Sequence, residues 1–275
     1  MRQFSLLFFL LIVGVVCSQN STSSKAIPFT IGETVSVQSE ILQENRTLNI
    51  YLPRGYDESK KKYPIIYLLD GSADEDFIHI AGLVQFGSFS WINMLPESIV
   101  VGISNIDRKR DFTFPSTVKL DQEEFPTSGG SEKFIQFLER ELQPFIASRY
   151  KVSEEKTIIG QSLGGLLAAE ILLKKPSLFN NYIIVSPSTW WDNESILKQE
   201  ATKTWAPKQV YIAGGTEGPT MQTGAINLYY KLLAASKDTK NKVFYHFLEA
   251  QDHGDALHLA VYNAFEKLFE NETKK

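Results

Sequence analysis

An alternation between short apolar segments and longer helical patterns constrains the fold of this chain more than any other feature. Continuous apolar runs are typical of strands that are covered on both faces of a sheet. Such runs occur at 64–69, 98–104, 157–160, 182–185, 209–213 and 243–248. Segments 131–149, 163–173 and 257–268 show apolar patterns that are typical of helices. The alternation predicts an α/β fold with a mostly parallel central sheet and helices on both faces.

Two details of this pattern predict local geometry. Residues 34–42 and 46–52 have the character of strands and are joined by a short polar turn. So tight a connection cannot make a parallel crossover, and the two strands should pair antiparallel at one edge of the sheet. Pro144 should bend the helix 131–149 near its end, because proline cannot donate a helical hydrogen bond.

Residues 1–18 have the composition of a secretory signal peptide. A short basic start with Arg2 precedes an apolar run that extends to Cys17, and a polar stretch follows. The run is shorter than the roughly 20 residues that a membrane-spanning helix needs. We expect cleavage after Ser18, export to the periplasm or the medium, and a single α/β domain over residues 19–275. Lipid attachment at Cys17 is the alternative.

The net charge bears on the partners of this chain, and its cysteine content bears on disulfides. The formal net charge is −4, which gives no electrostatic reason to expect nucleic acid or an anionic membrane as a partner. Cys17 is the only cysteine, so cleavage after Ser18 would leave no disulfide. A domain of this length can build a sufficient core without one. The sequence does not reveal the oligomeric state.

The strongest chemical motif is a nucleophile elbow. Residues 160–164 read Gly-Gln-Ser-Leu-Gly and lie between the strand 157–160 and the apolar helix 163–173. A serine on such a strand-to-helix turn is held above the sheet with its hydroxyl exposed. Ser162 is therefore the predicted nucleophile.

A serine hydroxyl needs a base within hydrogen-bond reach. His79 precedes the elbow, His246 lies within the last strand pattern and His258 lies within the last helix. His253 lies in the polar loop between that strand and that helix, where the base follows the serine in this fold. His253 is the predicted general base.

The acid of a triad should follow the strand 209–213. Glu217 is the only carboxylate between Glu200 and Asp238, so its position favours it. A carboxylate there would orient the imidazole and stabilise the imidazolium. Asp252 is the alternative, although adjacent side chains seldom face each other.

The predicted oxyanion donors are two backbone N–H groups. One belongs to Leu163, directly after the nucleophile, and the other to Ser72, in the loop after the strand 64–69. Asp70 could brace that loop. We find no metal-ligand cluster and no phosphate-binding glycine loop, and the mechanism needs no cofactor.

Several segments together resemble the putative-esterase family, which includes ferric-enterobactin esterases, esterase D-like enzymes, feruloyl esterases and mycolyltransferases. The segments are 68–71, 101–103, 108–113, the elbow with Gly165, and 186–191. The resemblance covers residues 30 to 270 and implies an α/β-hydrolase fold. It also implies that Ser162 and His253 match the family's nucleophile and base, and that Ser72 and Leu163 line its oxyanion hole.

The arginine-rich loop and the tryptophan pair look most like the siderophore-hydrolase branch of that family. Some members of the branch work with a serine–histidine dyad, which leaves the participation of Glu217 open. Phe114 stands where the family usually has proline, so the shape of the loop 108–115 stays open as well.

Four further residues are candidate substrate contacts. Trp190 and Trp191 follow a strand end, where ligands bind in open α/β sheets, and could stack on an aromatic acyl group. One of the two should instead pack in the core. Arg108 and Arg110 could pair with an anionic ligand or form a solvated basic loop.

These residues predict a serine esterase that hydrolyses small carboxylic esters, such as siderophore catecholate esters, through an acyl-enzyme. The alternatives are a feruloyl or acetyl-carbohydrate esterase, an acyltransferase with the same site, and a hydrolase fold that only binds ligands.

Overall fold

The computed structural model describes residues 25–200, 209–236 and 240–273. The chain divides into two units, Met1–Thr30 and Ile31–Lys275. Residues 25–30 form no helix or strand. The predicted signal segment 1–18 lies outside the described residues, and all the strands and helices belong to the second unit.

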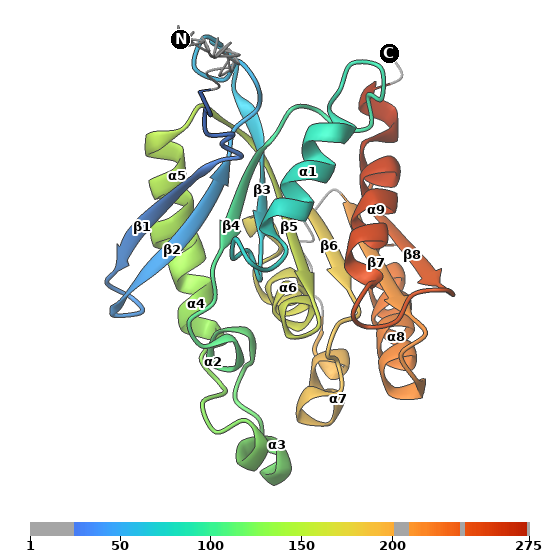
Figure 1. Ribbon diagram of the computed structural model, residues 1–275. Helices are drawn as coiled ribbons and strands as arrows, with labels where there is room; N and C mark the ends of the chain where they lie inside the picture. Colours follow the sequence, from blue (N-terminus) through green and yellow to red (C-terminus); the bar gives the residue numbers. More distant parts are fainter. Residues whose placement is uncertain (1–24, 201–208, 237–239, 274–275) are drawn as a thin grey trace, which may run out of the picture. The chain divides into compact units, whose positions relative to one another are not determined.

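A single sheet organises this unit (Figure 1). Its order is β1-β2-β4-β3-β5-β6-β7-β8. As predicted, β1 pairs antiparallel with β2 at the edge, β2 pairs antiparallel with β4, and every other pairing is parallel. The strands are β1 (Glu33–Ser39), β2 (Glu44–Tyr51), β3 (Tyr63–Leu68), β4 (Ile99–Ile103), β5 (Val152–Gln161), β6 (Asn181–Val185), β7 (Gln209–Gly215) and β8 (Lys242–Leu248).

Helices cover both faces of the sheet. Figure 1 shows α1 and α9 on the near face, and the core around α4, α5, α6 and α8 lies on the other. The helices are α1 (Phe77–Gly87), α2 (Arg108–Phe112), α3 (Lys119–Glu124), α4 (Ser131–Phe137), the π-helical turn η1 (Leu138–Leu142), α5 (Gln143–Arg149), α6 (Leu163–Lys174), the 3₁₀ turn η2 (Pro176–Leu178), α7 (Trp191–Lys198), α8 (Pro219–Ser236) and α9 (Ala256–Thr273).

The continuous apolar runs are explained by this two-sided covering. In β3, Ile66 and Leu68 pack toward α1 and α9, whereas Ile65 and Tyr67 pack into the core on the opposite face. Because successive side chains of a strand point to opposite faces, a strand covered twice must be apolar at every position. The α/β architecture predicted from the sequence is confirmed.

The predicted helix 131–149 is interrupted before Pro144. A π-helical turn, η1, joins α4 to α5, and Pro144 lies in the first turn of α5. Proline has no N–H to donate to the carbonyl four residues earlier, and a proline is tolerated at a helix start. The irregularity therefore lies in the turn that precedes the proline.

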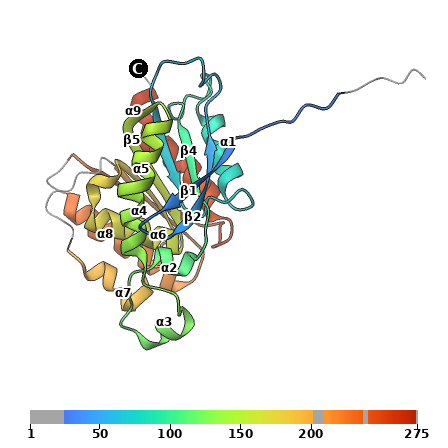
Figure 2. The same ribbon diagram turned by 90° about the vertical axis from the view of Figure 1, so that its left-hand side faces the viewer.

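The parallel strands all end at one edge of the sheet, and the short helices gather there. In Figures 1 and 2, α2, α3 and α7 lie at the end to which the arrowheads of the parallel strands point. Asp192, Asn193 and Glu194 in α7 have φ of 50°, 50° and 58°, so this turn is left-handed. Among the described residues, no helix is long and apolar enough to cross a membrane.

Candidate active site

The predicted elbow forms at the end of β5. Ser162 has φ 59° and ψ −120°, a conformation that is costly for any residue other than glycine. Backbone hydrogen bonds hold it, because the Ser162 N–H donates to the Val185 carbonyl at 3.0 Å and the Ser162 carbonyl accepts from Ser188 N at 3.0 Å. A Cβ atom at Gly160 would collide with the carbonyl of Gly164, so the turn requires glycine there.

His253 and Glu217 are brought together beside this elbow. His253 Nδ1 lies 2.6 Å from Glu217 Oε2, although 36 residues separate them in the sequence. The imidazole is 47% exposed, whereas the Glu217 side chain is 2% exposed. With Nδ1 directed at the carboxylate, Nε2 is the ring nitrogen that remains for a hydroxyl proton.

The electrostatics of the pair favour a charged imidazole. The hydrogen bond to Glu217 raises the pKa of His253 above its ordinary value, and the negative charge of Glu217 adds to that effect. Burial alone would raise the pKa of Glu217, but hydrogen bonds from His253, Ser186 and the Gly215 N–H outweigh burial and lower it. These hydrogen bonds favour an ionised Glu217, and its negative charge in turn favours the protonated form of His253.

Ser186 is a partner of Glu217 that the sequence analysis did not single out for a role. Its hydroxyl donates to Glu217 Oε1, which also accepts from Gly215 N at 2.9 Å. Ser186 is 1% exposed and has φ 43°. Since Oε1 is held by two donors, Oε2 is left to face His253.

Two hollows meet at the elbow, and both are lined by Ser162 and His253. The first measures about 520 Å³ and is also lined by Ser188, Trp190, Glu217, Met221 and Asp252. The second measures about 420 Å³ and is also lined by Asp70, Glu75, Asp76, Arg108, Gln161 and Gly254. Ser162 Oγ lies 3.3 Å from Ser188 Oγ.

The second hollow carries most of the charge at the site. Asp70 is 9% exposed, has φ 54°, and accepts from Arg108 Nε at 2.6 Å and from a second Arg108 nitrogen at 3.0 Å. That same nitrogen also donates to the Gln161 carbonyl at 3.1 Å. Arg108 thus ties the loop after β3 to the residue before Ser162, and Asp70 braces that loop as predicted.

Asp76 also lines this hollow, close to two other carboxylates. Burial, followed by the charges of Asp70 and Glu75, raises the pKa of Asp76 to about 6. The Ser72 N–H, one predicted oxyanion donor, is directed at Glu75 Oε2 at 3.4 Å. The other, Leu163 N–H, occupies the first position of α6, where a backbone N–H has no acceptor within the helix.

The remaining predicted substrate contacts, Trp190, Trp191 and Arg110, differ in where they lie relative to the two hollows. Trp190 is partly exposed and lines the first hollow, whereas Trp191 is fully buried and donates from Nε1 to the Phe114 carbonyl at 2.8 Å. Arg110 lines neither hollow, because Glu44 and Asp111 bind its guanidinium at 2.6 to 3.1 Å. The expectation that Arg110 contacts an anionic ligand is therefore not supported by its position.

The alternatives to the predicted base lie elsewhere. His246 is on the edge strand β8, 3.0 Å from the Tyr211 hydroxyl. His79 and His258 stack on each other with ring centroids 3.6 Å apart. Asp252, the alternative acid, lines the first hollow, but His253 Nδ1 contacts Glu217. In the part of the chain that the structure describes, no cluster of side chains could hold a metal ion.

Comparisons with known proteins show which family this chain resembles. Residues 39–263 match the model of the family described as "Putative esterase". The ferri-bacillibactin esterase BesA of Bacillus subtilis is 31% identical over 233 residues, which cover 76% of this chain and 80% of BesA. The family match extends over the residues that form both hollows.

Two solved structures are similar to this chain in fold. An IroE-like serine hydrolase from Shewanella oneidensis superposes with a TM-score of 0.78 and 28% identity, covering 87% of this chain and 80% of the other. The BES protein from Bacillus cereus superposes with a TM-score of 0.77 and 27% identity, covering 90% of this chain and 97% of the other.

Proposed function

Because the chain belongs to the putative-esterase family of carboxylic ester hydrolases, we propose that it hydrolyses siderophore esters with a Ser162–His253–Glu217 triad. The observation that carries this proposal is the 2.6 Å contact between His253 Nδ1 and Glu217 in a hollow that Ser162 also lines. That contact favours a triad over a serine–histidine dyad.

The proposed reaction passes through an acyl-enzyme. Ser162 Oγ attacks the ester carbonyl, its proton passes to His253 Nε2, and the alcohol leaves with that proton. Water then attacks the acyl-serine, gives its proton to His253, and Ser162 recovers its proton as the acid departs. Glu217 holds the imidazole and stabilises its charged form in both steps.

The oxyanion that forms in each step requires hydrogen-bond donors. The Leu163 N–H and the Ser72 N–H fill this role in the proposal. Because the Ser72 N–H is directed at Glu75 at 3.4 Å, this long contact has to break when substrate binds. A developing negative charge on the substrate oxygen would compete with the exposed Glu75 carboxylate for the donor.

The siderophore substrate is supported by the relatives and by one wall of the site. BesA is a ferri-bacillibactin esterase, as its name states. In this chain, Trp190 and Met221 line the first hollow beside Ser162. An acyl group that carries an aromatic ring, such as a catechol, could stack that ring on Trp190 and contact the Met221 sulfur.

A comparison of ester classes tests the substrate. The purified protein is incubated with a catecholate triester, a feruloyl sugar, an acetyl sugar and a short aryl ester, with and without an alcohol acceptor. We expect kcat/KM for the catecholate triester to exceed that for the others by at least about tenfold. Preference for a feruloyl or acetyl sugar would contradict the substrate, and transfer to the acceptor would identify an acyltransferase.

A further inference from the structure

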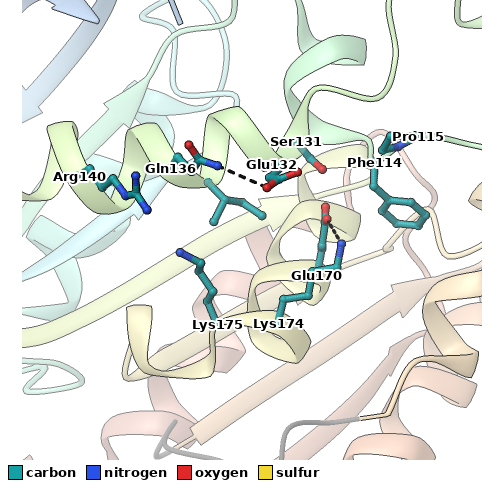
Figure 3. A pocket seen from close by; sticks show the side chains of 10 residues that line it. Phe114, Pro115, Ser131, Glu132, Gln136, Arg140, Glu170, Lys174 and Lys175 are labelled. Carbon is teal, nitrogen blue, oxygen red and sulfur yellow. Dashed lines mark hydrogen bonds and ion pairs between the residues drawn. The ribbon is translucent and has the colours of Figure 1, made fainter. Parts of the chain in front are cut away.

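A third pocket lies apart from the candidate active site and shares no lining residue with the two hollows. It measures about 490 Å³ and is built from α4, η1, the end of α6 and the loop after α2 (Figure 3). Its lining residues are Phe114, Pro115, Ser131, Glu132, Ile135, Gln136, Arg140, Glu170, Lys174 and Lys175. A volume of this size suits a small organic molecule.

Two buried polar groups in this pocket lack hydrogen-bond partners. Glu170 is 1% exposed, and its Oε1 accepts from Lys174 Nζ at 2.6 Å, but its Oε2 has no partner. The hydroxyl of Ser131, which is 0% exposed, has none either. Buried polar atoms are almost always paired, so Glu170 Oε2 indicates a missing donor and the Ser131 hydroxyl a missing partner of either kind. Figure 3 shows both groups at the same side of the pocket.

The opposite side of the pocket is cationic. The Arg140 side chain is exposed and makes no ion pair or hydrogen bond among the described residues, and Lys175 pairs with Glu139. Arg140 lies on η1 and Lys175 follows the last residue of α6, and both side chains line the pocket (Figure 3). A free guanidinium and an ammonium group that line one pocket favour a bidentate anion such as a carboxylate. Glu132, at the rim, is hydrogen-bonded to Gln136 at 3.4 Å.

Apolar groups connect the two polar sides. Ile135 lies on α4 between Ser131 and Arg140, and Phe114 and Pro115 form another wall. Ser131 and Arg140 are nine residues apart on nearly continuous helix, which is roughly 13 Å along its axis. A flat aromatic ring with polar groups at both ends matches this arrangement.

We infer that this pocket binds a small aromatic carboxylic acid that carries a hydroxyl group. The carboxylate binds Arg140 and Lys175, the ring packs against Ile135 and Phe114, and the hydroxyl donates to Glu170 Oε2 beside Ser131. Each contact supplies what the pocket lacks, namely an anion for the free guanidinium and a donor for the buried carboxylate oxygen. This inference does not depend on the proposed function.

Isothermal titration calorimetry with three matched probes tests the inference. The probes are 4-hydroxyphenylacetate, phenylacetate, which lacks the hydroxyl donor, and 2-(4-hydroxyphenyl)ethanol, which lacks the carboxylate. We expect the first to bind at least about tenfold more tightly than either of the others, because a hydrogen bond to a charged group is lost in each case. Equal affinities for all three probes, or no binding at millimolar concentration, would overturn the inference.

Variants locate the bound probe. Arg140→Ala should weaken binding of 4-hydroxyphenylacetate about tenfold, and since Arg140 is exposed, the variant should fold normally. Lys133→Ala is the matched control, because Lys133 is an exposed cation on α4 that does not line the pocket. Ser131→Ala and Glu170→Gln should also weaken binding. Unchanged binding by Arg140→Ala, or loss of binding by Ser162→Ala, would place the probe elsewhere and contradict the assignment.

Discussion

At the scale of single residues, the candidate site depends on how one buried carboxylate is held. Glu217 accepts hydrogen bonds from Ser186, the Gly215 N–H and His253, and these lower its pKa despite its burial. An ionised carboxylate in this position fixes the imidazole and raises the pKa of His253. The pair therefore has a measurable signature in the pH dependence of the reaction.

Glu217→Gln should lower turnover by a factor of about a hundred to ten thousand. It should also move the acidic limb of the kcat/KM profile to lower pH. His253 accepts a proton only when neutral, so activity falls as the pH drops below its pKa, and removing Glu217 removes the main cause of the raised pKa. Steady-state kinetics across pH 5 to 9, a range chosen to span the ordinary histidine pKa of about 6.5, measures both effects.

A control variant distinguishes the carboxylate from its surroundings. Ser186→Ala removes one donor to Glu217 Oε1 but leaves the Gly215 N–H and the contact with His253, so its effect should be smaller than that of Glu217→Gln. The effects of Glu217→Gln and His253→Ala should not add, because groups that act as a unit lose their effect together. A loss below about threefold for Glu217→Gln would support a serine–histidine dyad instead.

The sequence predicted those site residues whose position follows from the order of serine, acid and histidine along the chain. Ser162, His253 and Glu217 each follow a strand in the order typical of the fold, and the structure brings the latter two into contact. Ser186 and Met221 were not assigned roles, because their positions beside Glu217 and Trp190 depend on strands pairing across the sheet. The pairing of Arg110 with Glu44 could not be read from the sequence, because the two residues are 66 positions apart.

At the scale of elements, the turn from β5 into α6 depends on glycine. At Gly160, a Cβ atom would meet the Gly164 carbonyl and the Leu69 side chain. At Gly165, it would lie 2.9 Å from the Val185 carbonyl. The backbone of the elbow can approach its neighbours this closely only because these side chains are absent.

Gly160→Ala should therefore destabilise the fold by about 1–3 kcal/mol and lower turnover, because the collision is with backbone that cannot move aside cheaply. Thermal unfolding and ester turnover measure the two effects. Gly82→Ala is the matched control, since a Cβ atom there meets nothing within 4 Å and Gly82 lies within α1. That variant should be neutral or slightly stabilising, and equal effects of the two substitutions would refute this explanation of the turn.

Element boundaries were predictable only where local sequence decides them. The strand predicted over 34–42 ends at Ser39, because the Glu141 carboxylate accepts from the backbone N–H groups of Glu40 and Ile41 at 3.0 Å. That contact spans about a hundred residues of sequence. By contrast, the interruption of the helix before Pro144 follows from a local property of proline, which the sequence alone reveals.

At the scale of the whole molecule, a mostly parallel sheet with helices on both faces places the candidate site at one edge. The loops after β3, β5, β7 and β8 supply Asp70, Ser162, Glu217 and His253. Such an edge is where ligands bind in open α/β sheets. The fold class and this edge could be predicted from apolar periodicity, whereas the sheet order and the third pocket could not, because they depend on long-range pairing.

The predicted signal segment, residues 1–18, lies outside the described residues, and it bears on where the whole protein is located. We expect mass spectrometry of the exported protein to find Gln19 at its amino terminus, because the apolar run is followed by a polar segment after Ser18. An N-terminal lipid on Cys17 would show instead that the protein is tethered to a membrane. An intact Met1 on exported protein would remove the signal assignment altogether.

The central claim is that Ser162 is the nucleophile of an ester hydrolase, and one measurement tests it most directly. The wild type and Ser162→Ala are treated with a fluorophosphonate probe, analysed by intact-mass spectrometry, and assayed for ester turnover. We expect a single adduct on Ser162 in the wild type, no adduct in the variant, and a loss of turnover on the order of a thousandfold or more with little change in thermal stability. A folded Ser162→Ala protein that still reacts with the probe or turns over ester would contradict this role of Ser162.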